Sequence, residues 1–131
     1  MRLEDAEVHA ERWIRAWNTH DLDAILALYH DNIVLHSSRA STWDPSNADG
    51  TVRGKAALQK YFVAALDRFP QIELSILGIY VAQGDRMVLE YVNRPGPGTA
   101  VYVLERTLLE NHLAIDVEAA YGMERTSVPS D

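Results

Sequence analysis

Two side chains in this sequence can exchange protons and fall where a cavity could form. His36 closes a short apolar stretch typical of a buried strand, and an imidazole there could act as a base near neutral pH, or simply hydrogen-bond at the strand end. Glu90 interrupts the apolar run Met87–Val92. Because strand residues alternate between faces, Glu90 points either into a cavity or outward. An inward Glu90 would have a raised pKa and could act as acid or base, whereas an outward one would be solvated or lie at a dimer interface.

Other carboxylates occur at alternating strand positions. Glu105 shares a face with Val103 and Thr107, and the same two orientations are open to it. Asp116 and Glu118 share the more polar face of the last predicted strand. Because the more apolar face should meet the helices, we expect these two to point outward.

Five aromatic residues are candidates for a pocket wall. Trp13, Trp17, Tyr61 and Phe62 occur on the apolar faces of predicted helices, where they fit either core packing or the lining of an aromatic pocket. Trp43 differs because it stands in a polar, irregular stretch with no core pattern to explain it. It could fold over a bound ligand as a lid, or anchor its loop to the body of the protein.

Composition excludes several classes of function. The chain has 131 residues with 12 basic and 19 acidic side chains, a net charge of −7, and no visible basic stripe, so we expect no nucleic-acid partner. Cysteine is absent, and the five histidines are not spaced as a metal site, so neither a thiolate nor a bound metal is expected. No phosphate-binding glycine loop or serine nucleophile elbow occurs, and no cofactor is expected. Without a membrane-length apolar run or a signal peptide, a cytoplasmic protein with no membrane partner is the default expectation.

The order of predicted elements indicates an α+β fold. Apolar spacing of three and four predicts a first helix that ends near Asn18, and Asp21 can cap a second one. A long polar connection follows the first strand, a third helix begins at Gly54, and a β-meander completes the fold. The predicted strands cover residues 33–36, 72–81, 86–93, 100–110 and 113–123, in a single domain of residues 1–123 with a polar tail at 124–131. Early helices and late strands favour an antiparallel sheet curled around the first helix.

Short motifs in a fixed order carry a resemblance to a known family. They are Trp17–Asp23 followed by Leu28-Tyr29, Gly54–Leu58 before Tyr61-Phe62, Met87–Tyr91, and Ala120–Gly122. In this order and spacing the chain resembles the SnoaL-like group of the nuclear transport factor 2-like superfamily. The resemblance implies a cone-shaped α+β barrel, with a curved antiparallel sheet wrapped around N-terminal helices and a pocket inside. It also implies homodimers formed through the outer face of the sheet.

The resemblance does not select one reaction, because this superfamily includes isomerases, polyketide cyclases, epoxide hydrolases, dehydratases and non-catalytic binders. The steroid isomerases, a worked example of pKa tuning in acid–base catalysis, use a carboxylate base with a Tyr and a protonated Asp. Here Trp13 and Trp17 occupy the helix where the Tyr would be sought, and an indole donates a hydrogen bond but exchanges no proton.

The sequence therefore predicts a protein that binds a small, largely apolar molecule in an internal pocket, where cofactor-free acid–base catalysis of the isomerase, cyclase or hydrolase type could also take place. His36 and Glu90 are the predicted proton-transfer residues, and Trp17, Trp43 and Tyr61 would shape the pocket. The alternatives are a non-catalytic module that binds a ligand or a protein, and a fold whose outer sheet face assembles with another chain.

Overall fold

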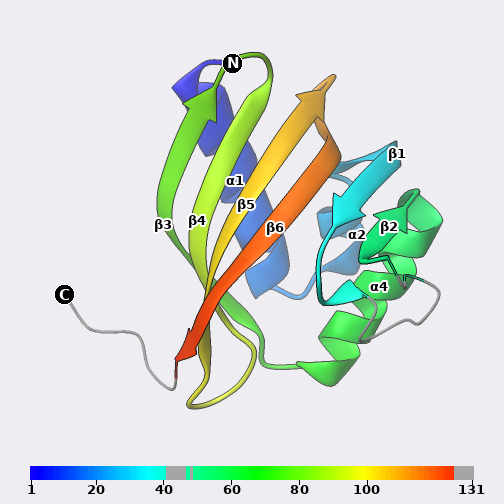
Figure 1. Cartoon of the computed structure of the whole chain (residues 1–131), viewed down its shortest axis with the longest axis vertical. Coiled ribbons are helices and arrows are strands. Elements are labelled where there is room, and N and C mark those ends of the chain that lie inside the picture. Colours follow the sequence, from blue (N-terminus) through cyan, green and yellow to red (C-terminus); the bar gives the residue numbers. More distant parts are fainter. Residues whose placement is uncertain (41–46, 48, 126–131) are drawn as a thin grey trace.

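A curved six-stranded sheet holds the long first helix in its concave face (Figure 1). The computed structural model describes residues 1–40, 47 and 49–125. The sheet has the strand order β2-β1-β6-β5-β4-β3 and is not closed, so β2 and β3 form its two edges. This arrangement confirms the predicted α+β class. No helix in the described ranges has the length and apolar character needed to cross a membrane.

Helix α1 (Leu3–Asn18) owes its place to one apolar stripe. Ala6, Ala10, Trp13 and Trp17 recur at spacings of four and three, and all four are buried. The two alanines let the first half of the helix approach the sheet closely, while the two indoles in the second half reach into the space between the helix and the strands. The sequence stripe thus divides α1 into a packing half and a pocket-forming half.

The end of α1 is attached to β3 (Glu73–Ala82) through the side chain of Asn18. Its Nδ2 donates to the Leu74 carbonyl oxygen at 2.9 Å, and its Oδ1 accepts from the Leu74 backbone N–H at 2.7 Å. The side-chain amide of Asn18 therefore bonds both backbone groups of Leu74, as the backbone of a neighbouring strand would.

We expect Asn18→Ala to lower the free energy of unfolding by about 2 kcal/mol, because it leaves both backbone groups of Leu74 without a partner. Chemical denaturation of the variant and of Asn18→Asp, which can still accept from the Leu74 N–H, measures this effect. A loss below about 0.5 kcal/mol for Asn18→Ala would show that water replaces the amide at no cost.

The segment after α1 differs from the prediction at both of its strands. Asp21 caps α2 (Leu22–Leu26) by accepting from the Ala24 backbone N–H at 3.1 Å. Strand β1 (Tyr29–His36) then begins four residues earlier than predicted, because Tyr29 pairs with Ala114 on a strand distant in sequence. A short strand β2 (Thr51–Arg53), which the sequence did not predict, pairs antiparallel with β1 at the end of the polar connection.

The remaining elements follow the predicted order closely. Helix α4 (Lys55–Arg68) begins after Gly54, whose φ of 85° is accessible to glycine, and it packs beside β1 and β2 (Figure 1). The meander consists of β3, β4 (Arg86–Arg94), β5 (Ala100–Glu110) and β6 (Leu113–Arg125), all paired antiparallel. The pair β1–β6 is parallel, which the expectation of an antiparallel sheet did not include.

Candidate functional site

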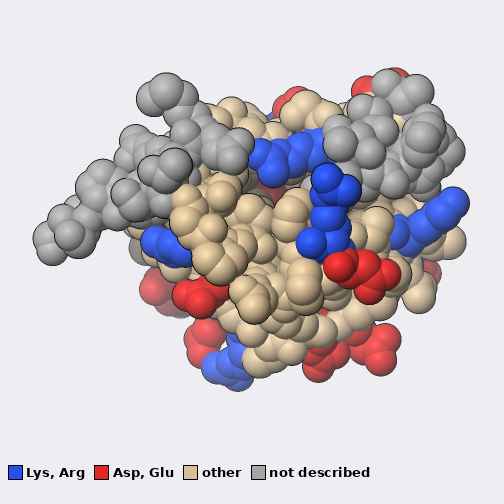
Figure 2. All heavy atoms as spheres, turned by 90° about the horizontal axis from the view of Figure 1, so that it is seen from below, with Lys and Arg blue, Asp and Glu red and all other residues tan. Residues whose placement is uncertain are grey.

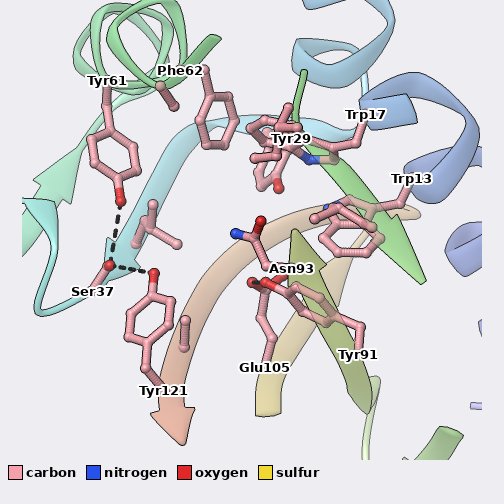
Figure 3. Close-up of a pocket in the computed structure, with 15 residues that line it drawn as sticks. Trp13, Trp17, Tyr29, Ser37, Tyr61, Phe62, Tyr91, Asn93, Glu105 and Tyr121 are labelled. Atoms are coloured by element: carbon pink, nitrogen blue, oxygen red, sulfur yellow. Dashed lines mark hydrogen bonds between the residues drawn. The ribbon is translucent and has the colours of Figure 1, made fainter. Parts of the chain in front are cut away.

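A pocket of about 70 Å³ lies between the concave face of the sheet and helices α1 and α4 (Figure 3). Its wall is mostly aromatic and aliphatic, with a few polar side chains. The residues that line it are Trp13, Trp17, Tyr29, Leu35, Ser37, Tyr61, Phe62, Ala65, Ile72, Leu74, Tyr91, Asn93, Glu105, Ala119 and Tyr121. An apolar cavity with a small number of placed polar groups is the usual form of a small-molecule site.

Edge-to-face contacts fix the aromatic wall. Trp13 and Tyr91 have ring centroids 4.9 Å apart, Trp17 and Phe62 5.0 Å, and Tyr29 and Phe62 5.5 Å. Each pair meets at a steep angle, an arrangement that aromatic quadrupoles favour. Four of the predicted pocket residues, Trp13, Trp17, Tyr61 and Phe62, line this cavity. Trp43, the fifth, lies outside the described residues.

Glu105 is the one carboxylate among the residues that line the pocket, and it enters from the middle of β5. It is 8% exposed, its register neighbours are Leu89 and Ala119, and Tyr91 Oη donates to its Oε1 at 3.0 Å. Burial raises the pKa of Glu105 to about 7, and the hydrogen bond from Tyr91 offsets only part of that rise. Near neutral pH this side chain can therefore either give or accept a proton.

Two polar atoms in the pocket wall have no hydrogen-bond partner in the described part of the chain. They are the Trp17 Nε1 donor and the Asn93 Oδ1 acceptor, and both are buried. Figure 3 shows Asn93 extending into the pocket beside Glu105, with Trp17 on the facing wall. Buried polar groups are nearly always paired, so these two atoms provide a donor and an acceptor for a bound molecule.

A hydroxyl cluster forms the opposite side of the pocket. Ser37 Oγ lies 2.8 Å from Tyr121 Oη and 3.3 Å from Tyr61 Oη (Figure 3). Burial raises the pKa of both tyrosines above the ordinary value, so each keeps its proton and remains able to donate. The guanidinium of Arg39 lies over the Tyr121 ring, 4.5 Å from its centroid. The pocket thus contains a carboxyl group and a hydroxyl cluster on separate parts of its wall.

His36 is not part of this pocket. The alternation that turns Leu35 and Ser37 inward turns His36 outward, where its Nε2 lies 3.6 Å from Asp116 Oδ2. The expectation of a base near the pocket mouth is corrected accordingly. Asp116 and Glu118 point outward as expected.

Glu90 also lies outside the pocket, on the convex face of the sheet. Met87, Leu89 and Tyr91 are buried and alternate with the half-buried Val88 and Glu90, so Glu90 faces away from the helices. Val92, which shares the face of Glu90, is buried as well. Its carboxylate accepts hydrogen bonds from Tyr80 Oη at 3.1 Å and from Tyr102 Oη. The sequence left both orientations of Glu90 open, and the structure has the outward one. The predicted role of Glu90 in proton transfer required the inward orientation and is corrected accordingly.

The sequence left the orientation of Glu105 open. On β5 the face that includes Glu105 also carries Val101, Val103 and Thr107, and all four are buried. The opposite face carries Tyr102, Leu104 and Leu108, so the rule that the more apolar face meets the helices, which placed Asp116 and Glu118 outward, does not decide between the two faces of β5. No pattern marks Ser37 or Asn93 either, because Ser37 follows the end of one predicted strand and Asn93 is the last residue of another. No group of three or more metal-ligand side chains occurs among the described residues.

Comparison with known proteins is consistent with this geometry. The SnoaL-like domain family matches residues 10–108 of the chain. A SnoaL-like protein of unknown function from Burkholderia thailandensis has a similar structure, with a TM-score of 0.82 and 26% identity over 94% of this chain and 99% of that one. Among curated proteins, none matches the chain.

Two more distant structures share the fold. A Sinorhizobium meliloti protein proposed to be a polyketide cyclase has a TM-score of 0.72 and 16% identity over 92% of this chain and all (100%) of that one. The Mycobacterium tuberculosis protein Rv0760c, solved in complex with estradiol-17beta-hemisuccinate, has a TM-score of 0.73 and 17% identity over 91% of this chain and 95% of that one. At these identities the likeness is one of fold.

Proposed function

This chain belongs to the SnoaL-like domain family, and on that premise we propose that it binds one small, largely apolar molecule in the pocket and transfers a proton to or from it through Glu105. The observation that carries the proposal is a buried carboxyl group with a pKa near 7 in an otherwise aromatic and aliphatic cavity. A group titrating at the working pH exchanges protons most effectively. The reaction would be of the isomerase, cyclase or hydrolase type and would need no cofactor.

The neighbouring groups give Glu105 a defined role. The hydrogen bond from Tyr91 fixes one carboxyl oxygen, which leaves the other free to face the bound molecule. Trp17 Nε1 and Asn93 Oδ1 would orient that molecule, because neither atom has a hydrogen-bond partner among the described residues. Two fold relatives, one proposed to be a polyketide cyclase and one solved with a bound steroid ester, support small-molecule chemistry in such a pocket.

A panel of small ketones, epoxides and alkenes, assayed for product by mass spectrometry, tests the proposal. We expect Glu105→Gln to lower turnover of any accepted compound at least ~100-fold while binding persists, because Gln retains the shape but cannot exchange a proton. Glu90→Gln and His36→Gln are the matched controls on the outer face and should retain turnover. Unchanged turnover in Glu105→Gln would reject the catalytic role, and binding without turnover across the panel would favour the non-catalytic alternative.

We also propose that two copies associate through the convex face of the sheet. Tyr80 and Leu104 are 54% and 41% exposed there, next to the less exposed Val88 and Tyr102. Exposed apolar side chains that gather on one face often mark an association surface.

We expect Leu104→Arg to convert the dimer to a monomer, because burying a guanidinium in that interface removes it from water at a cost that a nearby carboxylate does not necessarily repay. Light scattering coupled to size-exclusion chromatography measures the mass. Leu77→Arg is the control, since Leu77 is 53% exposed but lies in a groove against α1. A monomeric wild type, or a dimer that persists in Leu104→Arg, would contradict this assembly.

A further inference from the structure

A second hollow adjoins the pocket at the end of the sheet where the chain passes from β4 to β5. This outer groove has a volume of about 360 Å³ and is lined by Arg39, Phe69, Pro95, Gly96, Thr99 and Val101. It lies close to the inner pocket at two points. Arg39 lies over the ring of Tyr121, which lines the pocket, and Val101 is the register partner of Asn93, which also lines it.

The inner pocket is too small to hold a typical ligand by itself. Its volume of about 70 Å³ compares with roughly 300 Å³ at the lower end for small-molecule sites. The outer groove is large enough to take the remainder of a longer molecule. A ligand that fills both hollows would place one end beside Glu105 and the other beside Arg39.

The charge of the outer groove is unusual for this protein. The chain has a net charge of −7, yet no carboxylate lies within ion-pair distance of Arg39 in the described part of the chain. Arg68, also without an ion pair there, lies 5.8 Å from the ring centroid of Phe69, which lines the groove. Figure 2, which views the molecule from this end, shows basic side chains near the centre of the face and acidic ones mostly toward its edge.

Arg39 is also held in position. Its backbone N–H donates to Ser37 Oγ at 3.3 Å, and its guanidinium stacks on Tyr121. Stacking leaves the edge N–H groups of the guanidinium free to make a pair of parallel hydrogen bonds, which fit the two oxygens of a carboxylate.

We propose that the ligand is an amphipathic carboxylic acid, whose apolar part enters the inner pocket and whose carboxylate binds Arg39 in the outer groove. This inference rests on the proposed function, because it specifies the class of molecule that the same pocket binds. It assigns to Arg39 the role of selecting an anionic ligand, separate from any proton transfer at Glu105.

A matched pair of probes tests the inference. 3-Phenylpropanoate and the uncharged 3-phenylpropanamide have the same apolar part and nearly the same shape, and their binding can be followed by NMR titration of the full chain. In the wild type we expect the acid to bind about five- to tenfold more tightly than the amide, with the preference falling as salt is added. In Arg39→Gln the two affinities should become equal, while Arg39→Lys should keep part of the preference.

The controls separate the possible failures. Arg86→Gln makes the same change of net charge at the opposite end of β4 and should leave the preference intact. An unchanged preference in Arg39→Gln, or an equal loss of acid and amide binding, would overturn the role of Arg39 while leaving the pocket in place. Tighter binding of 2-phenylethylphosphonate, by more than about tenfold over the acid, would overturn the carboxylate in favour of a phosphate group. If the amide shifts no pocket resonance in the wild type, the proposed function itself fails.

Discussion

Replacing Glu105 with Gln is expected to stabilise the folded protein by up to about 3 kcal/mol at pH 8, even though it removes the proposed catalytic group. Burial raises the pKa of Glu105 from an ordinary 4.5 to about 7. Each pKa unit corresponds to about 1.4 kcal/mol. The folded state therefore favours a protonated carboxyl, and its stability is fully present below pH 4.5 and is lost as the pH rises through 7. Gln is neutral at every pH and avoids that loss.

The measurement is chemical denaturation of wild type and variant from pH 4 to pH 9. The difference between the two should grow from near zero at pH 4 to a plateau above pH 8. Glu110→Gln, an exposed change at the end of the same strand, is the control and should stay within about 0.5 kcal/mol of wild type. A difference between wild type and Glu105→Gln that does not vary with pH would mean that Glu105 is not held in a desolvating environment.

This cost to stability is itself an argument about function. A buried carboxyl with one hydrogen bond from Tyr91 is a poor choice for packing, since Gln or an aliphatic residue would serve better. The same is true of Trp17 Nε1 and Asn93 Oδ1, which lie buried without partners in the described part of the chain. Natural proteins tolerate such local violations mainly at functional sites. The three occur together in one cavity, which supports its assignment as the working site.

The sequence predicted most of the fold because its elements have strong local signals. The stripe through Trp13 and Trp17, the cap at Asp21 and the two-residue connection between the strands predicted at 100–110 and 113–123 each follow from nearby residues. Strand β2 was missed because it is three residues long and is fixed by pairing with β1, which no local pattern reveals. The early start of β1 was missed for the same reason, since Tyr29 is placed by β6.

The candidate site was harder to predict because it depends on which face of each strand is inside. Alternation allows two orientations for every strand, and a shift of one residue exchanges the inner and outer faces. Glu90 therefore lies outside, while its neighbour Tyr91 lies inside. His36 and Ser37 differ in the same way at the end of β1. The aromatic residues of α1 and α4 could be predicted because helical periodicity defines one buried side. Tyr29, Tyr91 and Tyr121, which complete the aromatic wall, lie on strands, as does Glu105. His36 and Glu90, the proton-transfer residues predicted from sequence, are both absent from the residues that line the pocket, where the carboxylate is Glu105.

A second ionisable group, His9 in α1, should oppose the pH dependence that Glu105 causes. His9 is 9% exposed, and burial, aided by the positive charge of Arg12, lowers its pKa from 6.5 to about 4. The folded state therefore favours the neutral imidazole. Its contribution to stability is fully present above pH 6.5 and is lost as the pH falls toward 4.

Between pH 4.5 and pH 6.5 the two groups act in opposite directions. The folded state holds one extra proton on Glu105, and the unfolded state holds one extra proton on His9. Each contributes a slope of at most about 1.4 kcal/mol per pH unit, so the two contributions largely cancel in the wild type. We expect His9→Gln to show stability that falls with rising pH across this window, and Glu105→Gln to show stability that rises.

The double variant decides whether the cancellation is real. With both groups removed, the slope should return to that of the wild type, whatever the absolute stability of each variant. Comparing slopes also removes the background from other carboxylates, such as Asp49, whose lowered pKa acts in all four proteins alike. Parallel curves for wild type and both single variants would show that neither side chain is buried as the structure places it. Opposite slopes would establish, independently of any substrate, that Glu105 is buried with the raised pKa on which its proposed catalytic role depends.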